Sequence, residues 1–165
     1  MLFRSPAPVP ESVVEAATAI GRQVVEALDA VGVITAELFL LGDGSLAVNE
    51  LAPRVHNSGH WTIEGARTSQ FEQHVRAICG LPLGDPAAHG PTAMANLLGA
   101  GELRDARLAG LADALADSGA HVHVYGKRQV FDRRKMGHVT VSGADSLDDA
   151  LARAVAARDR LRWES

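Results

Sequence analysis

Apolar residues recur at helical spacing in several segments of the chain. One such segment predicts a helix over 10–30 that stops near Gly32. A second helix is indicated by the capping-box pattern of Ser69 and Glu72, with Gly80 at its end. Two further helices are predicted in GLADALADSG and in SLDDALARAVAARDRL, where acids stand near the start and arginines near the end.

Runs rich in β-forming residues alternate with these helices. VITAELFLL and SLAVNELA are separated by GDGS, a strong hairpin signal. Three more strands are predicted in TAMANLLG, HVHVYGK and RKMGHVTVSG. The sequence therefore predicts an α+β fold.

A change of composition at GLPLGDPAAHGP, residues 80–91, indicates a linker between two domains, 1–89 and a smaller β-rich one over 90–165. The start, MLFRSPAPVPES, lacks the apolar stretch of a signal peptide, and its prolines favour an extended entry into a domain.

The composition is that of an ordinary globular protein, with 165 residues, 47% hydrophobic and 22% charged. A net charge of -4 gives no indication of a nucleic-acid partner, and no 18-residue apolar run suggests a membrane span. The single cysteine, Cys79, fits a reducing compartment, so we expect a cytoplasmic protein. We expect its thiol to be buried near a helix end.

The hairpin predicts a cation site if its turn is centred on Asp43 and Gly44. In this register Glu37 and Glu50 stand directly opposite each other. Their Cβ atoms would be roughly 5 Å apart, and the two like charges would repel each other. A hard divalent cation such as Mg²⁺ removes the repulsion by coordinating both carboxylates, although two solvated glutamates at a strand end remain an alternative. The turn pairs Leu41 with Leu46, Phe39 with Val48, and Glu37 with Glu50.

The residues after this hairpin, in NELAPRVHNSGH, add a candidate anion site. Arg54 carries a planar fork suited to phosphate or carboxylate, and His56 and Asn57 are adaptable donors beside it. A cation at two glutamates beside an anion at an arginine suits phosphoryl chemistry. A surface ion pair remains the alternative for Arg54; zinc at His56 and His60 is disfavoured by the lone cysteine and the neighbouring carboxylates.

NELAPRVHNSGHWTIEGARTSQFEQHVRA, followed later by YGK and RKMGH, resembles the 5-(carboxyamino)imidazole ribonucleotide synthetases of purine biosynthesis, in the ATP-grasp superfamily. The resemblance covers the C-terminal part of a family member, somewhat under half. It implies the C-terminal subdomain of an ATP-grasp fold, followed by a small β-rich appendage. It also implies an ATP-dependent ligase that activates bicarbonate as carboxyphosphate and carboxylates 5-aminoimidazole ribonucleotide.

The resemblance also implies roles for individual residues. Glu37 and Glu50 would hold Mg²⁺, Asn49 would contact the nucleotide cofactor, and Lys127 and Arg134 would grip the ribonucleotide phosphate. Arg54, His56 and Asn57 would line the catalytic pocket for bicarbonate, carboxyphosphate and the aminoimidazole. Where the family usually has Arg-Pro-Gly before RKMGH, this chain has Phe131, Asp132 and Arg133.

The groups that clamp ATP, and the domain that supplies most of the ribonucleotide site, lie upstream of these motifs in the family. We therefore expect the chain alone to be inactive. We also expect its parent enzyme to be a homodimer. The alternatives are a non-catalytic structural or dimerisation piece, or part of another ATP-grasp ligase or carboxylase. Other side chains have simpler predicted places: His121 and His123 in solvent, and, in the core, Trp61, Phe71, Val75 and Ile78.

Overall fold

The computed structural model describes residues 1–164, which divide into two compact units. The sheet unit contains Met1–Pro6, Glu64–Ala66 and the residues from Ala88 onward. The hairpin unit contains Ala7–Ile63 and Arg67–Ala87. The first residues were expected to be a plain extended entry, but they form strand β1 (Leu2–Ser5) of the sheet unit, outside the unit that holds most of 1–89.

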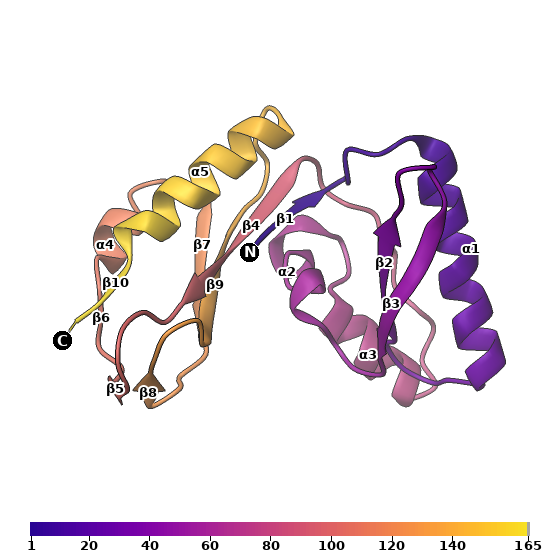
Figure 1. Ribbon diagram of the computed structural model, residues 1–165, viewed down its shortest axis with the longest axis horizontal. Coiled ribbons are helices and arrows are strands. Elements are labelled where there is room, and N and C mark those ends of the chain that lie inside the picture. The colour runs from indigo at the N-terminus through magenta and orange to yellow at the C-terminus, as the bar shows by residue number, and fades with distance from the viewer. Residues whose placement is uncertain (165) are drawn as a thin grey trace. The chain divides into compact units, whose positions relative to one another are not determined.

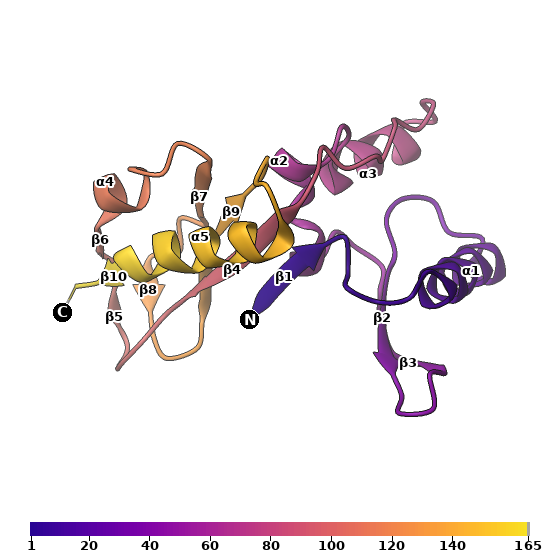
Figure 2. The same ribbon diagram turned by 90° about the horizontal axis from the view of Figure 1, so that it is seen from above.

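The sheet unit is built on four antiparallel strands in the order β1-β4-β9-β7, with helix α5 (Leu147–Arg160) laid across one face (Figures 1 and 2). Strand β1, from the first residues of the chain, forms one edge of the sheet and pairs with β4. The remaining strands of the sheet are β4 (Thr92–Leu98), β7 (Ala120–Val124) and β9 (Lys135–Val141).

Small side chains let α5 approach the sheet closely. Ala150 and Ala154 are fully buried and lie one helical turn apart, so they share the inner face. They pack in the same core cluster as Ala93, Ala95 and Val139 on the sheet. Burying this apolar face stabilises the unit by removing it from water.

Short elements complete the sheet unit. Arg104 ties the end of the chain to a loop, because its guanidinium donates to the carbonyls of Ala100, Glu102, Trp163 and Glu164. The short elements are β5 (Arg104–Asp105), paired with β8 (Gln129–Val130), β6 (Leu108–Ala109), paired with β10 (Arg162–Trp163), and α4 (Leu111–Ala114).

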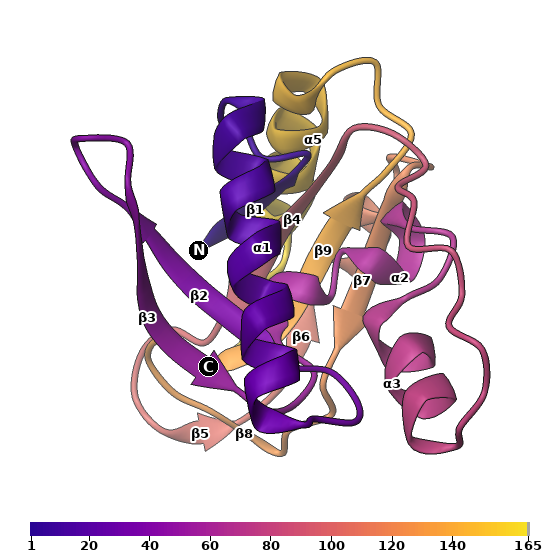
Figure 3. The same cartoon turned by 90° about the vertical axis from the view of Figure 1, so that its right-hand side faces the viewer.

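In the hairpin unit, helix α1 (Glu11–Leu28) lies alongside a two-stranded hairpin (Figure 3). The helix ends at Leu28, before the predicted Gly32, because the next residue, Asp29, adopts the left-handed conformation with φ 46. The hairpin is formed by β2 (Thr35–Leu40) and β3 (Leu46–Ala52). After it come the 3-10 turn η1 (Asn57–Gly59), α2 (Thr62–Gly65), whose last residues belong to the sheet unit, and α3 (Gln70–Ile78).

The predicted register of the hairpin is right at the glutamates and wrong toward the turn. Glu37 pairs with Glu50. Nearer the turn, however, Phe39 pairs with Ala47 instead of Val48, and Leu46 pairs with Leu40 instead of Leu41. The turn is a three-residue loop closed by a hydrogen bond from Leu41 N to Ser45 O, 2.9 Å. This shifts the register by one residue, and a bulge at Asn49 shifts it back.

The prediction that the apolar face of α3 belongs to a core is wrong. Phe71 is 38% exposed, Val75 52% and Ile78 55%, and Trp61 is half-buried. Cys79 is also exposed, against the prediction of a buried thiol. The reason is that no other described residue covers the outer side of this helix. No helix among residues 1–164 has the length and apolar character to span a membrane.

An ion pair joins α5 to the turn before β7. Arg153 donates from Nε to Asp117 Oδ2 at 2.7 Å and from Nη2 to Oδ1 at 2.6 Å. The Arg153 guanidinium, together with the amide of Gly119, lowers the pKa of the Asp117 carboxyl to about 2. Because this pKa lies below the ordinary value of 3.8, the pair stabilises the fold above pH 3.8 and loses this effect as pH falls toward 2.

We therefore expect Asp117→Asn to lower the free energy of unfolding by about 1 kcal/mol at pH 7, a value reduced for solvent screening. Urea titrations of the variant and the parent chain should differ less and less as pH falls from about 4 to about 2. The matched control is Asp159→Asn, at a more exposed carboxylate beside Arg158. A difference that stays constant down to pH 2 would contradict the role of the carboxylate charge.

Candidate functional site

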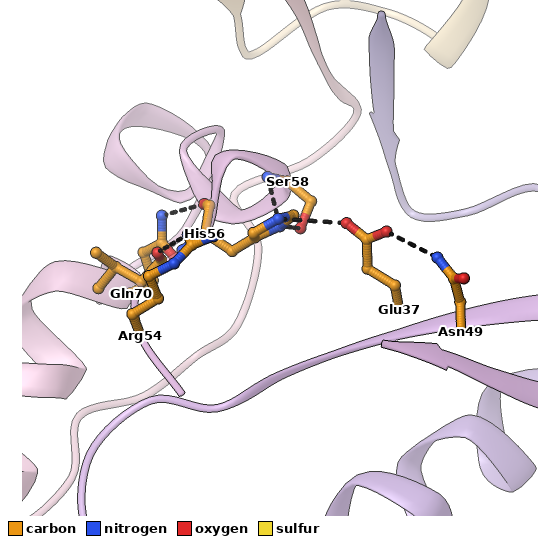
Figure 4. Close-up of polar contacts among 7 residues, drawn as sticks. Glu37, Asn49, Arg54, His56, Ser58 and Gln70 are labelled. Carbon is orange, nitrogen blue, oxygen red and sulfur yellow. Dashed lines mark hydrogen bonds and ion pairs between the residues drawn. The ribbon is translucent and has the colours of Figure 1, made fainter. Parts of the chain in front are cut away.

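The carboxylates of Glu37 and Glu50 lie together at the cross-strand position that the sequence predicts. With His56 they form a group whose ligand atoms all lie within 4.8 Å of one another. Asn49, the extra residue of the bulge, turns its amide to Glu37, with Nδ2 3.4 Å from Oε2 (Figure 4). In an unbroken strand the Asn49 side chain would point to the opposite face from Glu37 and Glu50. The bulge instead brings its amide to the Glu37 carboxylate.

The imidazole of His56 is oriented by its own loop. Its Nδ1 accepts a hydrogen bond from the backbone N–H of Ser58 at 3.3 Å and lies 2.8 Å from the Ser58 hydroxyl. A nitrogen that accepts from an N–H carries no proton, so in the neutral ring the proton sits on Nε2. Nε2 lies 3.2 Å from Glu37 Oε1 and therefore donates to that carboxylate. His56 thus orients a candidate metal ligand, and its protonated Nε2 has no lone pair to offer a metal.

The side chain of Gln70 holds the backbone of His56 in place. Its Oε1 accepts from the His56 N–H at 2.9 Å, and its Nε2 donates to the His56 carbonyl at 2.8 Å. Nε2 also lies 2.8 Å from Nδ1 of His60. Gly59 makes this approach possible, because a Cβ there would lie 2.6 Å from the Gln70 oxygen. Ser69 caps α3 just before, accepting from Glu72 N as the capping-box pattern predicts.

Arg54 and Asn57 follow the paired glutamates in the segment that leads into η1. Arg54 is exposed, and its Nη1 donates to the carbonyl of the next residue, Val55, at 3.1 Å. Within residues 1–164 it forms no ion pair, so its fork stays available to an incoming anion. Asn57 is half-buried and begins η1. Nε2 of His56 lies on Glu37, whereas Nδ1 of His60 lies on the Gln70 amide.

Lys127 and Arg134 lie in the sheet unit, where backbone carbonyls hold both side chains. Lys127 Nζ donates to the carbonyl of Lys135 at 2.6 Å. Arg134 Nη1 donates to the carbonyl of Gln129 at 2.7 Å, and its guanidinium stacks on Phe131 at 5.0 Å. The two cations are thus each fixed on the loop that joins β7 to β9, through β8.

The turn before Arg134 contains a strained residue. Arg134 N donates to Phe131 O at 3.2 Å, which closes a four-residue turn, and Arg133 at its third position has φ 62. Turns of this kind prefer proline at the second position and glycine at the third. Here Asp132 and Arg133 occupy those places, and the turn is kept.

Comparison with known proteins identifies two domains in the chain. The ATP-grasp domain model matches residues 2–71, and the phosphoribosylaminoimidazole carboxylase C-terminal domain model matches residues 92–153. The N5-carboxyaminoimidazole ribonucleotide synthase of Mycobacterium tuberculosis H37Rv is 49% identical over 151 residues, which are 88% of this chain and 34% of the relative. The chain belongs to the N5-carboxyaminoimidazole ribonucleotide synthetase family.

Solved structures of the N5-carboxyaminoimidazole ribonucleotide synthetase family share the fold. The Thermotoga maritima enzyme superposes with a TM-score of 0.91 at 45% identity, over 98% of this chain and 45% of that protein. An Aspergillus clavatus enzyme, solved with ADP and 5-aminoimidazole ribonucleotide, gives 0.82 at 36% identity, over 96% and 43%. The chain thus spans about a third of the curated relatives it matches, and under half of these solved proteins.

Sequence reasoning missed Gln70, which stands behind His56 within the family-like stretch SQFE. Its only signal was its place directly after the capping Ser69. We expect Gln70→Leu to lower the free energy of unfolding by about 2 kcal/mol, because it leaves the N–H and C=O of His56 without their partners. Chemical denaturation checks this, with Gln23→Leu on an exposed position of α1 as control. Equal stability of the two variants would be evidence against the clamp.

The strain at Arg133 can be tested by restoring the glycine that the family usually has at this position. Arg133→Gly should raise the free energy of unfolding by up to about 1 kcal/mol, because glycine adopts positive φ without a Cβ clash. Arg128→Gly, at an exposed position without positive φ, should instead lower stability through the freer unfolded chain. Thermal unfolding of both variants measures the contrast, and a fall in stability for both would refute the strain.

Proposed function

We propose that this chain supplies one wall of the active site of an ATP-dependent ligase that carboxylates 5-aminoimidazole ribonucleotide with bicarbonate. The observation that carries the proposal is the pairing of Glu37 and Glu50, with Nε2 of His56 on Glu37, in a chain of this family. The curated relatives compared above are named N5-carboxyaminoimidazole ribonucleotide synthase, and the A. clavatus structure holds ADP and 5-aminoimidazole ribonucleotide.

The donors at the paired glutamates fit Mg²⁺. They are hard carboxylate oxygens, exposed or half-exposed, and the nearby imidazole nitrogen is already occupied. Glu37 and Glu50 would hold the ion, and the amide of Asn49, which lies 3.4 Å from Glu37, would contact the nucleotide. When bound, the ion supplies positive charge that neutralises the charge developing on a transferred phosphoryl group.

The protein's own groups carry the remaining steps. The exposed fork of Arg54 binds and orients bicarbonate and then carboxyphosphate, and Asn57 adds an amide donor or acceptor at the same wall. His56 keeps Glu37 in one rotamer by a hydrogen bond to Oε1. In the sheet unit, Lys127 and Arg134 bind the 5′-phosphate of the ribonucleotide, each as a charge fixed on a backbone carbonyl.

A second candidate function is a non-catalytic structural or dimerisation piece. The observation in its favour is that the chain spans about a third of its curated relatives, while the family's nucleotide clamp is expected upstream of its motifs. In this candidate, as in the first, the domain division of the family falls near 89/90 and the parent enzyme is a homodimer.

The decisive test is the activity of the full-length enzyme that contains this chain, followed as ADP release that depends on bicarbonate and 5-aminoimidazole ribonucleotide. Glu50→Gln should lower kcat by about 10²- to 10³-fold, the scale for loss of one preorganised charge-stabilising group. Glu72→Gln, at an exposed glutamate paired with Arg76, is the control and should keep the parent rate. Rates for Glu50→Gln within threefold of the parent would favour the non-catalytic candidate.

A further inference from the structure

A continuous series of contacts crosses the sheet unit and ends at Lys127. Its Nζ lies over the ring of Tyr125 at 5.6 Å, and the Tyr125 hydroxyl lies 2.9 Å from Nδ1 of His138. The rings of His138 and His123 are stacked at 4.5 Å, and Nε2 of His123 lies 2.6 Å from Oε1 of Glu64. We propose that Glu64, His123, His138 and Tyr125 are positioning residues that fix the ammonium of Lys127 for a phosphate-bearing substrate.

The proposal rests on the role proposed above for Lys127. Neither spacing nor composition predicts the contact series, because its members come from three separate segments of the chain. The prediction that His123 lies in solvent is wrong. Its side chain is 34% exposed, and its Nε2 contacts the carboxylate of Glu64. The reason is that Glu64, at the end of α2, belongs to the sheet unit and covers this position.

The strands place these rings with little freedom. His123 and His138 are direct cross-strand partners on β7 and β9, which puts their side chains on one face. Tyr125 follows His123 by two residues, and its backbone N–H still donates to Met136 at 2.9 Å, so its side chain continues along that face. His138 is 1% exposed, so it cannot move aside without opening the core of the sheet.

Desolvation of the Glu64 carboxylate has a cost that stability alone does not explain. The side chain of Glu64 is 13% exposed, and its Oε2 is buried with no hydrogen-bond partner among the described residues. Replacing a buried ionic pair with apolar side chains is often neutral or stabilising. The pair is therefore better explained by the geometry that it imposes: Glu64 fixes His123, which fixes the stacked His138, which fixes the phenol of Tyr125.

At the far end of the series, the ring of Tyr125 and a carbonyl hold the Lys127 ammonium. Nζ donates to the carbonyl of Lys135 at 2.6 Å and lies over the ring, where the face of the π system attracts a cation. Lys127 is half-buried, whereas the side chain of Lys135 is exposed. These two are the only lysines of the chain, so each can serve as a reference for the other.

The first test measures how firmly Lys127 is held in the 165-residue chain. Acetylation by acetic anhydride, followed by peptide mass spectrometry, gives the rate at Lys127 relative to the rate at Lys135. His123→Leu and Tyr125→Phe should each raise this ratio about fivefold, the factor that matches loss of one ordinary hydrogen bond. His121→Leu, at an exposed histidine on the same face of β7, is the matched control and should leave the ratio unchanged.

Tyr125→Phe removes one oxygen and keeps the ring, so it decides the test if His123→Leu fails to fold. A ratio that stays at the parent value in Tyr125→Phe would overturn the proposal. This measurement needs no enzymatic activity, so its failure is distinct from failure of the proposed function.

The second test uses the full-length enzyme and separates positioning from general damage. His123→Leu or Tyr125→Phe should raise KM for 5-aminoimidazole ribonucleotide by about fivefold and leave KM for ATP unchanged. A matching rise for both substrates would overturn the proposal, since a merely structural role would affect both. An unchanged ribonucleotide KM in Lys127→Ala would instead remove the role proposed for Lys127 in the function.

Discussion

The mutual repulsion of two carboxylates is the constraint on which the arrangement of the hairpin unit depends. Glu37 and Glu50 are direct cross-strand partners, the arrangement in which like charges destabilise a sheet. Hydrogen-bond donors offset this repulsion at Glu37, because Nε2 of His56 and the amide of Asn49 both lie against its carboxylate. Glu50 stays exposed. The result is an asymmetric pair, with one carboxylate fixed and the other open to a cation.

The fixed half of the pair is supported by regular structure. The capping Ser69 begins α3, so Gln70 stands at the rigid first turn of a helix, and its carboxamide binds both polar groups of the His56 backbone. His56 in turn orients Glu37. Contacts of this kind keep functional side chains within the narrow geometric limits that catalysis demands. The same logic holds in the sheet unit, where backbone carbonyls hold Lys127 and Arg134.

Local patterns predicted the elements and the glutamate pair, because periodicity, caps and turn residues act over short distances. The register shows the limit. A two-residue turn was assumed, the structure has a three-residue loop, and the bulge at Asn49 restores the pairing that a simple count gave. Strand β1, the Gln70 clamp and the Glu64–His123 contact were all missed, because their partners are distant in sequence. The exposed face of α3 was missed because periodicity identifies an apolar face without showing what covers it.

The two units differ in how much of their own stability they supply. The apolar cluster of the sheet unit runs through β4, β7, β9 and α5, whereas Ala52 is the one buried apolar residue among the described residues of the hairpin unit. A two-stranded hairpin buries little surface and is at best marginally stable by itself. The hairpin unit instead leaves large apolar side chains exposed, including Leu28, Val31 and Ile78. Phosphoryl transfer depends on position as much as on charge. In the proposed function, the carboxylate pair therefore depends on how firmly the hairpin that carries it is held.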